Sequence, residues 1–183
     1  MNFKFEAFPA EAGVYDVERG QLPGLNPLYW QTDTSISKNS WGYIHEPDYK
    51  TSYQLITDLV DIVSKNGCLL LNVGPKPDGT IPEREQEILL EIGQWLDVNG
   101  EAIFDTRPWT SFGEGPTEID TGMFSDNDRS IFTPQDFRFT TKDNALYAMC
   151  LNWPEETAVI STLSEAETRE KGKIASIEML GSG

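Results

Sequence analysis

The chain has 183 residues, which is enough for one ordinary domain or for parts of two. Hydrophobic residues make up 38 % of it and charged residues 24 %, a composition that excludes a disordered chain. No apolar run approaches the roughly 20 residues that a membrane-spanning helix needs, so we expect no membrane span. Thirty acidic against 14 basic residues give a net charge of −16, which argues against nucleic acid as a partner.

The scarcity of histidine and cysteine restricts the chemistry of the chain. His45 is the only histidine, and Cys68 and Cys150 are the only cysteines. A structural zinc site or a Ser-His-Asp triad would be hard to build from these residues. We therefore expect the chemistry to depend on carboxylates, without a metal ion or another cofactor. Cys68 begins an apolar run and is interpreted as a buried free thiol.

The first 50 residues contain loops rich in proline, glycine and aromatic residues, with one strand expected over Asn2–Ala7. A helix follows, because Thr51 and Gln54 have the spacing of a capping box and apolar residues recur at helical spacing after them. Gly67 is expected to end this helix. The continuous apolar run Cys68–Val73 then predicts a strand that is buried on both faces.

A second helix is predicted to begin at another capping box, formed by Thr80 and Glu83, and to end at Asn99-Gly100. Ile103-Phe104 suggests a short strand after it. This alternation of helices and strands favours a parallel α/β sheet. One buried parallel strand needs neighbours on both sides, so we interpret this region as the closing part of a larger sheet or barrel. Both ends of the chain look like cuts, and the missing strands are expected before Met1.

The pattern changes from about residue 112, where 113–116 look like a linker. Alternating apolar residues predict strands in four later segments, 132–141, 145–153, 157–163 and 173–180. We therefore predict two regions. Residues 1–111 would form the α/β region, and residues 112–183 would form an antiparallel, β-rich second domain.

Three segments between residues 29 and 109 resemble the α-L-fucosidases of glycoside hydrolase family 29: YWQTDTSISKNSWGY, LVDIVSKNGCLLLNVGPKPDGTIP and EIGQWLDVNGEAIFDTRPW. The preceding YDVERGQLPGLNPLYW resembles a bacterial branch of the family. The resemblance implies the C-terminal part of a (β/α) TIM-like barrel, followed by an incomplete antiparallel β-sandwich. It also implies retaining hydrolysis of terminal α-L-fucose from glycans or glycoconjugates, without a metal ion. The parent enzyme is expected to be secreted or periplasmic.

Retaining hydrolysis uses two carboxyl groups about 5 Å apart, one as nucleophile and one as general acid/base. The resemblance places the nucleophile, an Asp, on an earlier barrel strand before Met1, so we assign that role to no residue of this chain. Many members carry Glu after the tryptophan that matches Trp30, but this chain has Gln31, whose amide cannot transfer a proton. The expected acid/base is therefore Glu18, with Glu46 as the alternative.

Two further residues are expected at the sugar site implied by the resemblance. Trp41 could pack on the apolar face of fucose, or it could be a core residue that supports its loop. Arg19 could orient the substrate or lower the pKa of the neighbouring Glu18 carboxyl group.

The sequence leaves three interpretations of function. The first is part of an α-L-fucosidase, inactive as an isolated chain because it lacks the nucleophile. The second is a module that binds glycans, or has a structural role, without hydrolysing them. The third is the remnant of a gene that no longer functions.

Overall fold

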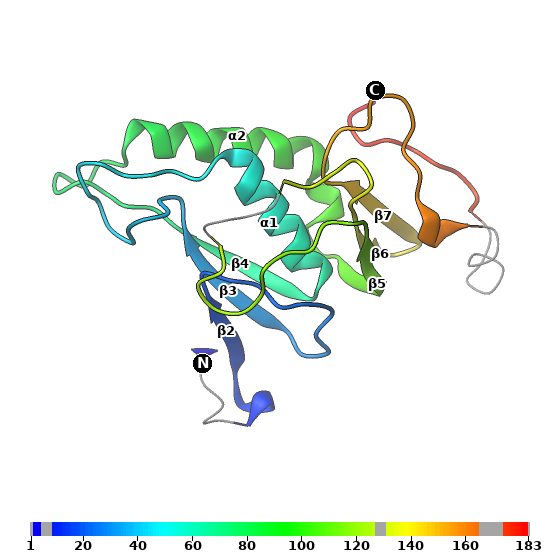
Figure 1. The fold of residues 1–183 in the computed structure, drawn as a ribbon, viewed down its shortest axis with the longest axis horizontal. Helices are drawn as coiled ribbons and strands as arrows, with labels where there is room; N and C mark the ends of the chain where they lie inside the picture. Colours follow the sequence, from blue (N-terminus) through cyan, green and yellow to red (C-terminus); the bar gives the residue numbers. More distant parts are fainter. Residues whose placement is uncertain (1, 5–8, 127–130, 165–173, 183) are drawn as a thin grey trace.

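The computed structural model describes residues 2–4, 9–126, 131–164 and 174–182, which form two sheets and two long helices (Figure 1). The parallel sheet contains four strands in the order β1 (Asn2–Phe3), β2 (Val14–Glu18), β3 (Trp30–Ser35) and β4 (Gly67–Asn72). The antiparallel sheet contains β5 (Arg107–Glu114), β6 (Phe137–Lys142) and β7 (Ala145–Cys150). The helices are α1 (Ser52–Ser64) and α2 (Glu83–Asn99), and short 3-10 turns cover Ala10–Ala12, Gly100–Ala102 and Ser161–Leu163. An α/β fold with a parallel sheet, followed by an antiparallel sheet, is thereby confirmed.

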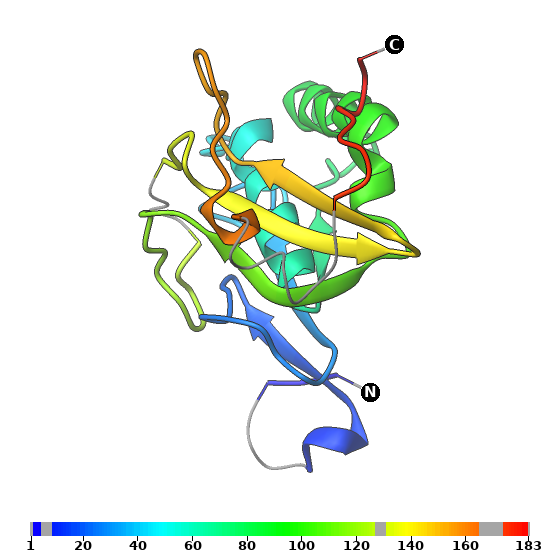
Figure 2. The same cartoon turned by 90° about the vertical axis from the view of Figure 1, so that its right-hand side faces the viewer.

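Helix α1 lies between the two sheets and packs against both (Figures 1 and 2). On the side of the parallel sheet, Ile62 packs with Val17 and Trp30. On the other side, Val60 belongs to a cluster with Phe132 and Leu151. A helix that buries apolar residues on two sides is a central element of a core rather than a surface helix. The two sheets therefore share one helix as their common packing surface.

The predicted capping box at the start of α1 is confirmed. Thr51 Oγ1 accepts a hydrogen bond from the Gln54 N–H at 3.2 Å, and the Thr51 N–H donates to Gln54 Oε1 at 2.9 Å. The end of the helix differs from the expectation, because Asn66, with φ = 72°, adopts the left-handed conformation instead of Gly67. Gly67 is the first residue of β4, where an added Cβ would lie 2.5 Å from the Trp30 ring. Close packing therefore requires this glycine.

The second predicted capping box is wrong. Thr80 donates from its N–H and its hydroxyl to Asp78 Oδ1, at 2.9 and 2.7 Å, and so stabilises a turn. Pro82 precedes the first helical residue of α2 and provides no side-chain cap. The strand expected at Ile103-Phe104 is also absent, because both N–H groups donate to the carbonyl oxygen of Gly100 in a turn.

The strands of the C-terminal half follow the prediction only in part. Strands β6 and β7 lie within the predicted segments 132–141 and 145–153, apart from Lys142 at the end of β6. Gly113 and Glu114, expected in a linker, belong to β5. Instead of a strand, residues 157–163 contain only the 3-10 turn Ser161–Leu163, and residues 174–180 form no strand. The remaining residue of the 173–180 prediction and residues 5–7 of the predicted first strand lie outside the described part of the chain.

Strand β4 is less buried than its apolar sequence suggests. It is the last strand of the parallel sheet, and Leu70 is 54 % exposed. Cys68 is half-buried rather than buried, and both cysteines are free thiols. The prediction of a strand buried on both faces is therefore wrong for the described residues. None of the helices in the described ranges is long and apolar enough to cross a membrane.

Candidate active site

Three carboxylates lie together on one face of the parallel sheet. Asp16 and Glu18 alternate with Val17 along β2, so both point away from the face that α1 covers. Asp33 of β3 pairs in register with Glu18. Lys4 lies between them, with its Nζ 2.9 Å from Glu18 Oε2, 3.1 Å from Asp33 Oδ2 and 3.8 Å from Asp16 Oδ2. Glu18 therefore ends β2 inside a cluster of mixed charge.

Two groups in this cluster, Lys4 and Asp16, have a shifted pKa. Burial alone would lower the pKa of Lys4, but hydrogen bonds to Glu18 and Asp33 outweigh that effect and raise the pKa. Burial raises the pKa of Asp16, and the nearby charge of Asp33 raises it further. One lysine shared among three carboxylates thus leaves an excess of negative charge at this face.

Arg19 follows Glu18 directly and turns its side chain into the protein. It has φ = 47° and is only 6 % exposed. Its guanidinium donates hydrogen bonds to the carbonyl oxygens of Ser37, Lys38 and Ser40, at 3.2 to 3.4 Å. It also lies 4.3 Å from the ring centroid of Trp41, a cation–π distance. Arg19 is thus hydrogen-bonded to the loop that carries Trp41. Its described hydrogen bonds are made to carbonyl groups of the protein and not to solvent.

Residues 36–50, called here the Trp41 loop, are closed at their base by backbone pairing. The Lys50 N–H donates to the Ile36 carbonyl at 2.9 Å, and the Lys38 N–H donates to the Asp48 carbonyl at 2.7 Å. Trp41 is 37 % exposed, which leaves part of its ring open to solvent. Glu46 lies in the same loop and is exposed. The structure thus brings Arg19, the residue after Glu18, into contact with Trp41, and places Glu46 further along the loop.

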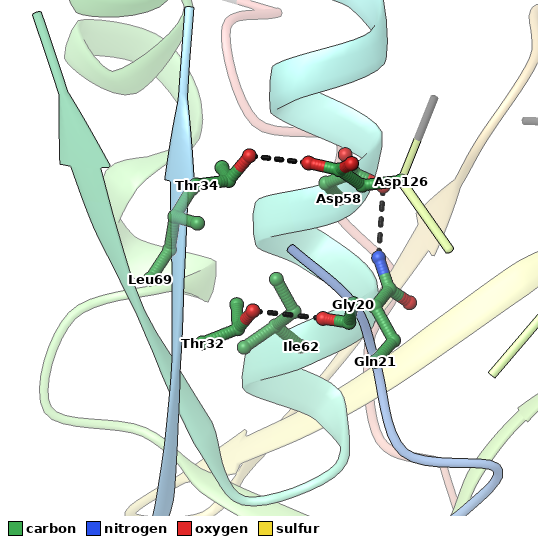
Figure 3. A pocket seen from close by; sticks show the side chains of 8 residues that line it. All are labelled: Gly20, Gln21, Thr32, Thr34, Asp58, Ile62, Leu69 and Asp126. Carbon is green, nitrogen blue, oxygen red and sulfur yellow. Dashed lines mark hydrogen bonds between the residues drawn. The ribbon is translucent and has the colours of Figure 1, made fainter. Parts of the chain in front are cut away.

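A small cavity lies between α1 and the parallel sheet (Figure 3). The cavity has a volume of about 10 Å³, which is about the smallest that can hold one water molecule. Two pairs of side chains that line it are hydrogen-bonded: Gln21 Nε2 donates to Asp58 Oδ1 at 2.8 Å, and the Thr34 hydroxyl donates to Asp126 Oδ2 at 2.5 Å (Figure 3). Within the described ranges, no group of three or more His, Cys, Asp or Glu side chains is placed to hold a metal ion.

Several residues of the site do not emerge from the sequence analysis: Lys4, Asp33, Lys50 and Asp126. Asp33 carries no clear signal, because β3, on which it lies, falls within the first 50 residues, where the sequence predicts loops apart from one strand at Asn2–Ala7. Lys50 and Asp126 carry none, because their contact joins positions 76 residues apart. Such a pair becomes visible only in the folded chain.

Comparison with known proteins identifies the group to which this geometry belongs. The sequence profile of the alpha-L-fucosidase family matches residues 4–101, which is more than half of the chain. Tissue alpha-L-fucosidase of Rattus norvegicus is 34 % identical over 173 residues, covering 92 % of this chain and 33 % of the rat protein. The chain therefore belongs to the alpha-L-fucosidase family.

Solved structures agree with this assignment. One alpha-L-fucosidase has a TM-score of 0.63 and 33 % identity, and the match covers 76 % of this chain and 29 % of that structure. The alpha-fucosidase of Thermotoga maritima, solved in complex with fucose, has a TM-score of 0.56 and 35 % identity, covering 70 % of this chain and 26 % of its own. The chain spans about a third of the length of these relatives. Mammalian and bacterial proteins match at similar identity, so the expected bacterial branch stays a prediction.

Proposed function

We propose that the chain carries the acid/base carboxyl group and one wall of the sugar site of an α-L-fucosidase. In this proposal the parallel sheet is part of a TIM-like barrel, and the antiparallel sheet is part of a β-sandwich. The complete enzyme would hydrolyse terminal α-L-fucose from glycans with retention of configuration. The observation that carries the proposal is the position of Glu18 at the carboxyl end of β2, directly before Arg19, which contacts Trp41. Active sites of barrel enzymes lie at this end of the strands.

The roles of the residues follow from their surroundings. Glu18 would protonate the leaving oxygen and then deprotonate the attacking water, as retaining hydrolysis requires of one carboxyl group. The open part of the Trp41 ring would pack against the apolar face of fucose. Arg19 would hold Trp41 in place, because its hydrogen bonds are made to the Trp41 loop. Asp33 and Lys4 would set the charge around Glu18.

A double displacement needs a second carboxyl group as nucleophile, and we infer that no residue of this chain supplies it. Asp33 lies beside Glu18, but both are bound to the same Lys4, so Asp33 acts as a charge partner. The purified 183-residue chain should therefore leave an aryl α-L-fucoside intact. A fusion that adds the remaining length of a relative, such as the Thermotoga maritima enzyme, should hydrolyse it. Turnover by the 183-residue chain alone would contradict the inference.

The acid/base role is tested by chemical rescue in that fusion. Glu18→Ala should lower kcat for an aryl fucoside about 10²- to 10⁴-fold, and added azide should restore part of the rate because it replaces the water that needs a base. Asp33→Asn is the matched control, since it changes a carboxylate that contacts the same lysine and should show no azide rescue. Rescue of Glu46→Ala instead would transfer the role to Glu46.

Binding of a glycan without hydrolysis is the second candidate function. It is favoured by the Trp41 ring, which is partly exposed and lies in contact with Arg19. Titration of the 183-residue chain with fucose, followed by tryptophan fluorescence, separates the two. Binding by the chain, together with an inactive fusion, would favour the second function over the first.

A further inference from the structure

A segment from beyond β5, residues 122–126, runs alongside the residues that follow β2. The Phe124 N–H donates to the carbonyl oxygen of Glu18 at 2.8 Å, and the Gly122 N–H donates to that of Gln21 at 2.8 Å. The approach is close, because a Cβ added to Gly20 would lie 1.7 Å from the Gly122 carbonyl oxygen. The segment 122–126 is therefore bound directly to the backbone on which Glu18 and Arg19 lie.

Asp126 at the end of this segment joins three groups from different parts of the site. Its Oδ2 accepts hydrogen bonds from Lys50 Nζ at 2.5 Å and from the Thr34 hydroxyl at 2.5 Å. The same oxygen lies 3.8 Å from the Arg19 guanidinium. Asp126 is only 4 % exposed, and Lys50 is only 1 % exposed. One carboxylate oxygen thus contacts two cations of the Trp41 loop region. Lys50 is the last residue of the loop, and Arg19 donates hydrogen bonds to its carbonyl oxygens.

Stability alone does not account for this arrangement. A buried ion pair often contributes no more stability than apolar residues of the same size would. Burial lowers the pKa of Lys50, even though Asp126 opposes that effect. In addition, Asp126 Oδ1 is buried without a hydrogen-bond donor among the described residues. The contact fixes a geometry at an energetic cost, which is typical of a functional site.

We propose that Asp126 is a positioning residue of the sugar site: it fixes Lys50 and Arg19, and through them the Trp41 ring that faces the sugar. The inference rests on the proposed function, which it extends to a residue outside the parallel sheet. Without the Asp126 charge, Lys50 and Arg19 would repel each other across the same buried space. The Trp41 loop, bound to Arg19 through three carbonyl oxygens, would then shift.

The first test uses the 183-residue chain and needs no activity. Asp126→Asn keeps the shape of the side chain but removes its charge. The fluorescence of Trp41 is isolated as the difference between each protein and its Trp41→Phe counterpart. We expect quenching of Trp41 by acrylamide to rise about twofold in Asp126→Asn, because the ring loses its support. Unchanged quenching would overturn the proposal.

The matched control is Asp136→Asn. Asp136 is also a buried carboxylate of the C-terminal half, but it accepts hydrogen bonds from Thr117 and Thr133, away from the Trp41 loop. These bonds, which outweigh the effect of burial, lower its pKa. Asp136→Asn should reduce thermal stability and leave Trp41 quenching as in the unmodified chain. If both variants changed quenching equally, general loosening would explain the effect and the proposal would fail.

The second test measures kinetics in the fusion described above. Asp126→Asn should raise KM about tenfold and change kcat less than threefold, because the Trp41 contact binds the ground state and the transition state alike. Changed quenching with an unchanged KM would overturn the assignment of Trp41 to the sugar site. That outcome would leave the Glu18 test unaffected, so failure of this inference and failure of the proposed function can be told apart.

If Asp126→Asn does not fold, the double variant Asp126→Asn/Lys50→Met replaces it. Removing both buried charges should restore folding, since no unpaired lysine remains. Arg19 still lacks its counter-ion there, so Trp41 quenching should stay raised. Quenching that returns to the value of the unmodified chain would show that Asp126 does not position Trp41.

Discussion

Gly67 shows at the scale of one residue how packing, rather than backbone conformation, can require a glycine. The sequence pattern Lys65-Asn66-Gly67 predicts a helix end at the glycine, but Asn66 adopts the left-handed conformation. Gly67 instead allows β4 to approach Trp30 and Ile62, whose side chains would lie 2.5 and 2.8 Å from an added Cβ. No pattern in the sequence distinguishes these two uses of a glycine.

Gly67→Ala should therefore lower the free energy of unfolding by about 1 to 3 kcal/mol, the usual cost of overpacking a core. Gly93→Ala is the matched control, because Gly93 lies within α2 and an added Cβ there would meet nothing within 4 Å. That variant should gain about 0.5 to 1 kcal/mol, since alanine is the better helix former. Urea denaturation of both variants checks the pair, and equal effects would contradict the packing argument.

In the candidate site, residues that belong to continuous sequence motifs can be predicted, whereas contacts between residues far apart in the sequence cannot. Glu18, Arg19 and Trp41 can be selected from the sequence because they belong to continuous motifs, and Arg19 and Trp41 do lie in contact. Their catalytic and binding roles stay predictions. Lys50 and Asp126 could not be selected, because a pair of charges separated by 76 residues follows no periodicity.

At the scale of elements, the two helices show how similar signals can have different outcomes. Thr51-x-x-Gln54 and Thr80-x-x-Glu83 both match the capping-box pattern, but only the first forms one. Asp78 accepts both donors of Thr80, which fixes the threonine in a turn before the helix. The sequence therefore predicts both helices, while their exact starts depend on competing side chains.

The strand expected at 157–163 does not form. Alternating apolar residues are not enough for a strand, because a strand must also pair with a neighbouring strand.

Thr51→Ala should destabilise the chain by about 1 kcal/mol, because it leaves an N–H group of α1 without its capping oxygen. Thr80→Ala serves as the control and should cost less than about 0.5 kcal/mol, since its hydrogen bonds lie in an exposed turn. Thermal unfolding followed by circular dichroism measures both. A larger loss in Thr80→Ala than in Thr51→Ala would show that the turn matters more than the cap.

At the scale of the whole molecule, a buried group of charges joins α1 to the antiparallel sheet. Asp61 of α1 contacts Lys65 Nζ at 2.6 Å and Arg138 Nε of β6 at 2.5 Å, and all three side chains are almost fully buried. Arg138 and Lys65 also lie over the ring of Phe112 in β5. Helix α1 is thus joined to the antiparallel sheet by charge as well as by its apolar surface.

Asp61→Ala should lower the free energy of unfolding by about 3 to 5 kcal/mol, because it leaves two buried cations without their counter-ion. Arg84→Ala is the control: its ion pair with Glu87 is 2.9 Å long but about half exposed, so its loss should change the free energy of unfolding little. Denaturation curves in urea measure the difference. A small effect of Asp61→Ala would mean that water can reach Lys65 and Arg138.

The contact between Thr34 and Asp126 also has a consequence for the newly made protein. The two residues are 92 positions apart, and ribosomes add about 5 to 20 residues per second, so about 5 to 20 s pass between their synthesis. During that interval Arg19 and Lys50 have been made but their counter-ion has not. The parallel sheet can begin to form, yet the Trp41 loop cannot take its final shape. This loop is therefore expected to be among the last parts of the nascent chain to acquire protection against proteases.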